Sequence, residues 1–268
     1  MTEFIEKLFS GLHSRPKIVF PEGENLTIIK ATMAAEEFVE PILLSGKNTL
    51  QRAAKMVASG KADSMVAGID YTSRDVILAA RDHIGMTGKT FSAAFVIELP
   101  DGGGIFTLAD CAACKNPTPE QLAEIVNQTA DMATQVLGNT PRVAMLSFST
   151  LGSGGSDPSI DKIHAAIEIV KAKHPDLAID GEMQLDTAVN PKIGSKKAPD
   201  STVAGRANVL ICPDLNTGNI LYKSMEQFAG AHAYGPILQG FSAPVSDLSR
   251  GSTLDDVLGV IAITVARL

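Results

Sequence analysis

The sequence predicts an α/β protein whose mostly parallel sheets are covered by helices on both faces. Up to Gly85, short apolar strands alternate with helical segments, and the connections between them are short. Strict alternation of this kind requires parallel strands that return through covering helices. After Gly85 the pattern changes to two apolar runs joined by Pro100–Gly103, which predicts an antiparallel hairpin. The hairpin indicates either a second domain or an edge ribbon.

The elements before Gly85 follow from apolar spacing and from turn residues. Apolar residues recur at helical spacing from Phe4 to Leu12, which predicts a first helix. The expected helices are 2–12, a segment after Glu24 to about Phe38, 49–59 and 72–83. The expected strands are 17–20, 41–44 and 64–68.

The alternation resumes after the hairpin. The run Asn-Pro-Thr-Pro-Glu at 116–120 is typical of a helix start, so a long helix is expected to about Leu137. The remaining expected helices are 159–173, 219–229 and 253–266. The expected strands are 91–99 and 104–110 in the hairpin, followed by 142–148, 177–180, 208–212 and 235–238.

Composition excludes several classes of function. A net charge of −7 argues against nucleic acid, because phosphate backbones are held by clustered Lys and Arg. No apolar run approaches the length of a membrane span, and Glu3 and Glu6 do not fit a signal peptide. The 3 cysteines lack the spacing of a disulfide framework, which suits a reducing compartment and predicts a cytoplasmic protein. Cys111-x-x-Cys114 is interpreted as incidental, and the histidines lack ligand spacing, so no metal site is expected.

The stretch from Ser246 to Asp256 concentrates reactive side chains after the 235–238 strand. Arg250 can hold a phosphate through two hydrogen bonds, Ser249 can donate to an oxyanion, and Asp256 can accept a proton. The same residues have a structural interpretation, because Thr253-x-x-Asp256 is also a helix capping box. Taken alone, this stretch favours the cap.

Two further polar loops follow predicted strands. The loop 147–156 consists almost entirely of hydroxyl residues and glycine, so its backbone amides could bind an anion; the alternative is a flexible surface loop. The run Pro213–Asn219 is the second, with Lys223 one helical turn beyond it. Asp214 and Lys223 could instead form a buried structural pair. Asp180-Gly181-Glu182 is a third polar strand end.

Taken together, these stretches resemble phosphate acetyltransferases (phosphotransacetylases), of the phosphate acetyl/butyryltransferase family. The resemblance covers nearly the whole chain, and the motifs occur in the family's order. They are Pro-Glu-Gly-Glu (21–24), Phe-x-x-Ala-Asp-Cys-Ala with Asn-Pro-Thr (106–118), Ser-Thr-x-Gly-Ser-Gly (149–154), Asp-Gly-Glu (180–182), Pro-Asp-Leu-Asn-x-Gly-Asn (213–219), Gly-Pro-Ile-Leu-Gln-Gly (235–240) and Val-x-Asp-Leu-Ser-Arg-Gly (245–251).

The chain departs from the family in two places. The family usually has several dozen more residues between the strand ending at Leu44 and the turn at Lys61, including an arginine beside the active site, so this chain is a shortened form. The family also places an arginine where this chain has Leu78. Arg74 lies four residues earlier, on the same helical face; either it substitutes for that arginine or the anion is held more weakly.

The resemblance implies reversible transfer of an acetyl group between acetyl-CoA and phosphate, giving acetyl phosphate and CoA by direct thiolate attack. It implies Asp256 as general base, with Ser249 and Arg250 as the other catalytic residues. No permanently bound cofactor is implied, because CoA is a substrate. The substrate-binding residues implied are Arg74, Ser149, Thr150, Gly152, Ser153, Gly154, Asn219 and Lys223.

The resemblance also implies a fold of two α/β domains, similar to isocitrate dehydrogenase, with a cleft between them. Residues 1–90 with 242–268 would form one domain and 91–241 the other, and the protein would be a homodimer. Two alternatives remain open. One is a phosphate butyryltransferase-like enzyme for a longer acyl group; the other is a relative that binds an acyl phosphate or CoA without catalysis.

Overall fold

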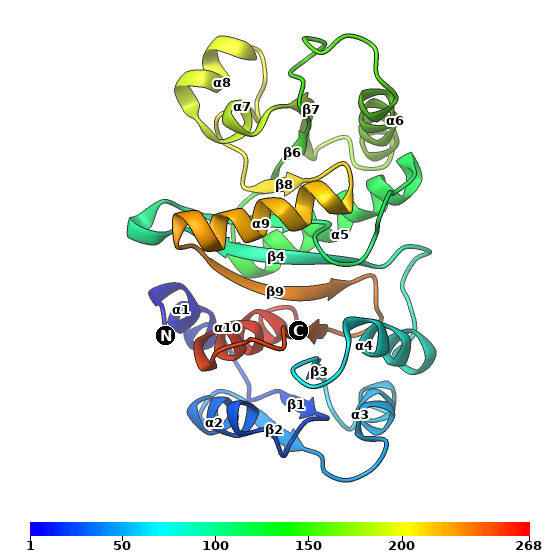
Figure 1. Cartoon of the computed structure of the whole chain (residues 1–268), viewed down its shortest axis with the longest axis vertical. Coiled ribbons are helices and arrows are strands. Elements are labelled where there is room, and N and C mark those ends of the chain that lie inside the picture. The colour runs from blue at the N-terminus through cyan, green and yellow to red at the C-terminus, as the bar shows by residue number, and fades with distance from the viewer. The chain divides into compact units, whose positions relative to one another are not determined.

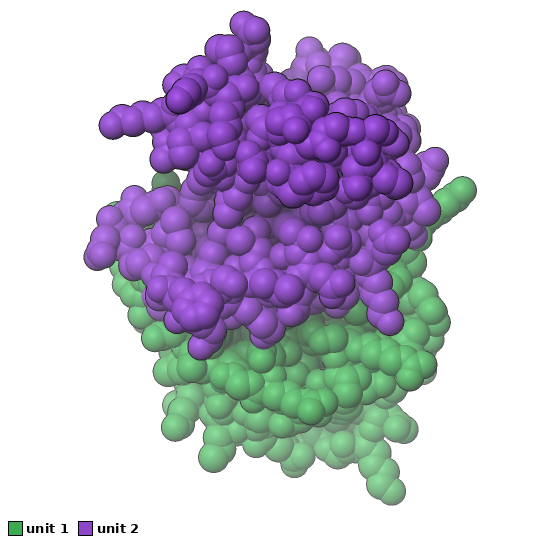
Figure 2. Space-filling view, turned by 45° about the horizontal axis from the view of Figure 1, so that its top comes forward, with its two compact units in different colours: residues 1–91, 234–268 green, residues 92–233 purple.

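The computed structural model describes all residues, 1–268. Internal contacts divide them into two compact units, Met1–Phe91 with Tyr234–Leu268 (unit 1) and Ser92–Ala233 (unit 2) (Figure 2). The chain returns to unit 1 at Tyr234, earlier than residue 242, where the sequence placed the boundary. The reason is strand β9 (His232–Gln239), whose residues Ile237 and Leu238 pair with strand β10 (Val245–Asp247) of unit 1.

Unit 1 is built on a sheet with the strand order β2-β1-β3-β10-β9. The pairs β1–β2, β1–β3 and β3–β10 are parallel, and only β9 runs antiparallel to its neighbour β10. The first three strands of the chain are β1 (Lys17–Phe20), β2 (Glu40–Leu43) and β3 (Ser64–Ala67). As expected from the sequence, the three strands before Gly85 are therefore paired in parallel.

Two groups of helices accompany this sheet (Figure 1). Helix α10 (Leu254–Val265) packs with α1 (Glu3–Ser10) and α2 (Leu26–Ala34). Helix α3 (Thr49–Ala58) packs with α4 (Ser73–Ala79) and with the π-helical turn η1 (Ala80–Ile84) that continues it. Every residue of α10 from Val257 to Val265 is buried, which accounts for its continuous apolar run.

Unit 2 contains the other strands, in the order β4-β5-β8-β6-β7. Strands β4 (Ser92–Glu98) and β5 (Ile105–Ala109) form the antiparallel hairpin expected from the sequence, joined by the short 3₁₀ turn η2 (Pro100–Gly102). All other pairs are parallel. They involve β6 (Arg142–Leu146), β7 (Ala178–Met183) and β8 (Val209–Ile211).

The helices of unit 2 confirm most of the expected boundaries. They are α5 (Pro119–Leu137), α6 (Pro158–Lys173), α7 (Leu185–Val189), α8 (Pro191–Lys197) and α9 (Leu215–Ala229). Thr118 caps α5 with a complete capping box, as the Asn-Pro-Thr-Pro-Glu run predicts. None of the helices in the chain is long and apolar enough to cross a membrane.

Four elements differ from the expectation. Strand β10 was not predicted, and it contains Ser246 and Asp247, so the turn with Ser249 and Arg250 follows β10 and not the strand β9 before it. Helices α7 and α8 were also missed. Helix α9 begins at Leu215 because the carboxylate of Asp214 accepts a hydrogen bond from the Thr217 amide (2.9 Å) and caps it.

Candidate functional site

Ser249 and Arg250 lie in the loop between β10 and α10, and both are exposed. The loop is a tight turn, in which the Ser249 amide donates to the Ser252 hydroxyl (3.0 Å) and the Ser252 amide donates to the Ser249 carbonyl (3.0 Å). The Gly251 amide also donates to the Ser249 hydroxyl oxygen (3.4 Å). The guanidinium of Arg250 forms no hydrogen bond or ion pair within the chain. This turn therefore presents an uncommitted cation and a hydroxyl to solvent.

Asp256 closes the capping box that the sequence predicts. Its Oδ2 accepts from the Thr253 amide (2.7 Å) and the Thr253 hydroxyl (2.8 Å), while the Asp256 amide donates to the Thr253 hydroxyl oxygen (3.3 Å). Both bonds to the carboxylate use Oδ2, and Oδ1 has no partner. The capping role and the role of proton acceptor are therefore compatible, because each uses a different oxygen.

Arg74 lies in the first turn of α4, which Thr72 caps through the Asp75 amide (3.2 Å). Its side chain is exposed and makes no polar contact within the chain. Leu78 is half-buried in the same helix. Because β3 and β10 are paired in parallel, with Ala67 beside Asp247, their carboxyl ends meet at one edge of the sheet. The segment leading to Arg74 and the loop with Arg250 both leave from that edge.

Glu22 organises this edge, and sequence reasoning gave it no role. Its buried carboxylate accepts from the amides of Gly68 (3.0 and 3.1 Å), Asp70 (2.8 Å) and Tyr71 (3.0 Å). Burial raises the pKa of Glu22, although these amides oppose the shift. Glu22 therefore fixes the loop between β3 and α4. Its position in Pro-Glu-Gly, directly after β1, is the sequence feature that could have indicated this role.

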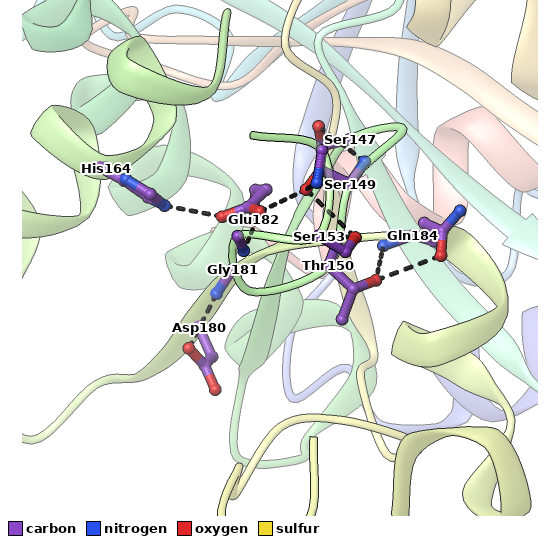
Figure 3. Close-up of polar contacts among 11 residues, drawn as sticks. Ser147, Ser149, Thr150, Ser153, His164, Asp180, Gly181, Glu182 and Gln184 are labelled. Carbon is purple, nitrogen blue, oxygen red and sulfur yellow. Dashed lines mark hydrogen bonds and ion pairs between the residues drawn. The ribbon is translucent and has the colours of Figure 1, made fainter. Parts of the chain in front are cut away.

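In unit 2, the loop 147–156 is held by Glu182 (Figure 3). The Ser149 hydroxyl (2.6 Å) and the Gly152 amide (2.7 Å) both donate to Glu182 Oε1, and His164 Nε2 lies 2.7 Å from Oε2. Burial alone would raise the pKa of Glu182, but the hydrogen bonds from Ser149, Gly152 and His164 outweigh it and lower the pKa. Glu182 is therefore a buried anion that shapes the loop from within.

The expectation that this loop offers backbone amides to an anion is not met in this conformation. Every amide from residue 150 to 154 already donates within the protein. The amides of Thr150 and Gly154 donate to the hydroxyls of Ser153 and Ser149, respectively. The Leu151 and Gly152 amides donate to the carbonyl and the carboxylate of Glu182, and the Ser153 amide donates to the Thr150 carbonyl. Ser149 and Thr150 are themselves buried, whereas Gly152, Ser153 and Gly154 are exposed.

The remaining predicted residues, Asn219 and Lys223, lie on α9. Asn219 Nδ2 donates to the Cys111 carbonyl (3.2 Å), and Lys223 is exposed with its Nζ 4.9 Å from the centre of the Tyr222 ring. The alternative of a buried pair between Asp214 and Lys223 is wrong, because Asp214 is committed to the cap of α9.

Lys162 was missed by sequence reasoning because it lies inside a long helix, α6. Its Nζ donates to the Pro213 carbonyl (2.7 Å) and to Asn116 Oδ1 (3.0 Å). Burial lowers the pKa of Lys162, while Asp214 opposes that shift. Lys162 thus ties together two stretches that the sequence had singled out, 106–118 and 213–219.

Comparison with known proteins gives a consistent result. Residues 45–265 match the family model described as phosphate acetyl/butaryl transferase. A phosphate acetyltransferase of Clostridium acetobutylicum is 42% identical over 271 residues, spanning 95% of this chain and 80% of the relative. One from Thermoanaerobacterium thermosaccharolyticum is 45% identical over 227 residues, spanning 82% of this chain and 69% of the relative.

The solved structures agree with the sequence relatives. A phosphotransacetylase from Streptococcus pyogenes superposes with a TM-score of 0.91 at 33% identity, covering 99% of this chain and 98% of that one. A 4-hydroxythreonine-4-phosphate dehydrogenase from Klebsiella pneumoniae shares the fold more distantly, with a TM-score of 0.57 at 10% identity, covering 96% of this chain and 100% of that one. On the family match and these identities, the chain belongs to the phosphate acetyl/butyryl transferase family.

Proposed function

We propose that this protein is a phosphate acetyltransferase, which interconverts acetyl-CoA and phosphate with acetyl phosphate and CoA. The observation that carries the proposal is the turn after β10, in which Arg250 is exposed and unpaired beside the Ser249 hydroxyl. A guanidinium without an internal partner is suited to a phosphate, because its donors match two phosphate oxygens. The relatives named phosphate acetyltransferase support the choice of acetyl as the acyl group.

The chemical steps assign a role to each side chain. Asp256 Oδ1 accepts the proton of the CoA thiol, because the thiolate is the nucleophile. The thiolate attacks the carbonyl carbon of acetyl phosphate, the bond from that carbon to the bridging oxygen breaks, and phosphate leaves with the bond's electron pair. Ser249 donates to the oxyanion formed on the carbonyl oxygen, and Arg250 and Arg74 hold the phosphate oxygens. In the reverse direction, a phosphate oxygen attacks the thioester, and the departing thiolate takes the proton back.

Unit 2 is proposed to bind other parts of the substrates. Lys223 is an exposed cation on α9, which suits the phosphate groups of CoA. The exposed Ser153, Gly152 and Gly154 offer a hydroxyl and a backbone surface without bulky side chains. Asn219, Ser149 and Thr150 support these groups from behind, since their polar atoms are engaged within the protein.

A thiol-release assay tests the function and separates the alternatives. Acetyl-CoA with phosphate should release CoA, and release should stop when phosphate is omitted. Release from butyryl-CoA at a much higher kcat/KM would support the longer acyl group. Binding of CoA without turnover of either thioester would support a non-catalytic relative and contradict the proposal.

The proposed setting of the enzyme is a cytoplasmic homodimer. The free cysteines Cys111, Cys114 and Cys212 are consistent with a reducing compartment. Helix α9 exposes Ile220 (65%) and Phe228 (90%), large apolar side chains that a second subunit could cover. CoA takes part as a substrate, and no permanently bound cofactor is proposed.

A further inference from the structure

Asp247 is a fully buried carboxyl group immediately before the turn that presents Ser249 and Arg250. It is the last residue of β10 and has no exposed surface. Neither of its carboxylate oxygens makes a hydrogen bond of normal geometry, although the Ser73 hydroxyl and the Leu248 amide are near enough to act on it. A buried carboxylate without partners is costly, and in such a site the protonated form is favoured.

A second carboxyl group lies on the other side of Gly68. A Cβ atom on Gly68 would come within 1.9 Å of Asp247 Oδ1, and Gly68 has a φ of +112°, so both space and backbone require glycine here. The Gly68 amide donates to both oxygens of Glu22 (3.0 and 3.1 Å). One glycine backbone therefore separates Asp247 from a carboxylate that already holds three amides.

No cation neutralises this pair. The groups acting on Asp247 are the Glu22 carboxyl, the Ser73 hydroxyl and the Leu248 amide, and Asp70 acts on Glu22 as a further negative charge. Neither Glu22 nor Asp247 forms an ion pair. Burial, with the Glu22 charge, raises the pKa of Asp247 to about 7. The amides bound to Glu22 favour its charged form, so Asp247 is the member that holds the proton.

We propose that Asp247 is a positioning residue for anion binding: as a neutral acid it permits phosphate and acetyl phosphate to bind at Arg250, and its ionisation weakens their binding. The proposal rests on the proposed function for the identity of the anion. Arg250 is three residues further along the chain, so at ~3.3 Å per residue the two Cα atoms can be no more than roughly 10 Å apart. Over that distance a new negative charge in a protein interior changes anion affinity by a few-fold to about tenfold.

Phosphate affinity measured against pH tests the proposal. The dissociation constant of phosphate should be determined by calorimetry between about pH 6 and about pH 8.5 for the wild type and for Asp247→Asn, which cannot ionise. Phosphate ionises identically with both proteins, so the ratio of the two constants isolates Asp247. The ratio of wild type to variant should be near one at the acid end and rise by a few-fold to about tenfold through neutrality.

Two further variants sharpen the result. Glu24→Gln removes an exposed carboxylate two residues from Glu22, and the ratio of wild type to this variant should not change with pH in this interval. Glu22→Gln removes the neighbouring charge that raises the pKa of Asp247. The pH at which phosphate affinity is half lost should therefore be higher in the wild type than in this variant. If Asp247→Asn does not fold, Glu22→Gln still tests the proposal. A midpoint of phosphate affinity against pH that is the same in Glu22→Gln and in the wild type overturns the proposal.

A stability measurement checks separately whether Asp247 titrates. Its pKa is higher folded than unfolded, so the wild type loses stability as pH rises from about 4 to about 7. Asp247→Asn has no such loss, and its melting temperature relative to the wild type should increase over the same interval. A constant difference overturns the proposal, as does a flat affinity ratio in an enzyme that turns over. If the protein shows no turnover but the affinity ratio changes with pH as predicted, the proposed function is contradicted and the proposal for Asp247 is not.

Discussion

Arg250 can be removed without disturbing the fold, because its guanidinium has no partner in the chain. Arg250→Ala should therefore leave the melting temperature nearly unchanged. Turnover should fall by orders of magnitude, because a charged contact to the transition state is lost. Arg81→Ala is a matched control, since Arg81 is an exposed arginine of the same unit that pairs only with Asp82 (2.8 Å). Near-normal turnover in Arg250→Ala would remove the turn after β10 from the active site.

Asp256 allows its two roles to be separated, because they use different oxygens. Asp256→Asn retains an oxygen that can accept from the Thr253 amide, so the loss of stability should be about 1 kcal/mol or less. Without a base, turnover should fall by roughly a hundredfold or more, and the deficit should shrink as pH approaches the pKa of the thiol. A deficit that stays constant with pH would leave Asp256 with an orienting role only. Turnover close to normal would reduce it to a helix cap.

At the scale of elements, the loop 147–156 depends on Glu182, which lies on β7. Glu182→Gln removes the buried charge that Ser149, Gly152 and His164 contact, which should cost on the order of 1–3 kcal/mol at neutral pH. The pKa of Glu182 is lowered in the folded protein, so its stabilisation is present above the unfolded pKa and is lost as pH falls through the folded value. Denaturant titrations at several pH values should show the two proteins converging in acid. A difference independent of pH would contradict the ionic role.

Helix α4 carries the departure from the family at Leu78. This residue is half-buried, four positions from the exposed Arg74. If Arg74 substitutes for the missing arginine, Arg74→Ala should raise the KM for phosphate several-fold, and Leu78→Arg should lower it in the wild type. Steady-state kinetics at constant ionic strength will measure both effects. An unchanged KM for phosphate in Arg74→Ala would show that Arg74 does not replace the missing arginine.

The elements also show what the sequence could and could not predict. The capping box of α10 was readable because Thr253 and Asp256 are neighbours in the chain. Strand β10 was missed because it is only 3 residues long and two of them, Ser246 and Asp247, are polar. The composition of the 147–156 loop indicated amides available to an anion, but their main acceptor, Glu182, lies some 30 residues away and becomes a neighbour only in the fold.

Site residues could likewise be predicted where they are neighbours in the chain, but not where only the fold brings them together. Arg250 and Ser249 could be proposed from one short stretch, because that stretch carries its reactive groups together. Glu22 and Asp247 could not be paired from the sequence, because their relation depends on Gly68 and on the parallel pairing of β3 with β10. Lys162 is hidden similarly, since its partners Pro213 and Asn116 come from two distant loops.

At the scale of the whole molecule, the proposed dimer makes a separate prediction. Phe228 is 90% exposed on α9, so Phe228→Asp should not disturb the monomer's core but should weaken an interface that covers this helix. Light scattering after size exclusion should give the mass of two chains for the wild type and a concentration-dependent fall for the variant. Met33→Asp, an exposed apolar residue on α2 (65%), is the matched control. A wild-type protein that elutes with the mass of one chain would contradict the homodimer.

Transfer of the acetyl group to phosphate, and not simple hydrolysis of the thioester, distinguishes this enzyme from a thioesterase. Phosphorus NMR of a reaction with acetyl-CoA and phosphate tests this directly. We expect a new acetyl phosphate signal that grows with the released thiol in equal amount and that is absent with Arg250→Ala. Thiol release without acetyl phosphate, or no release by a folded wild-type protein, would contradict it.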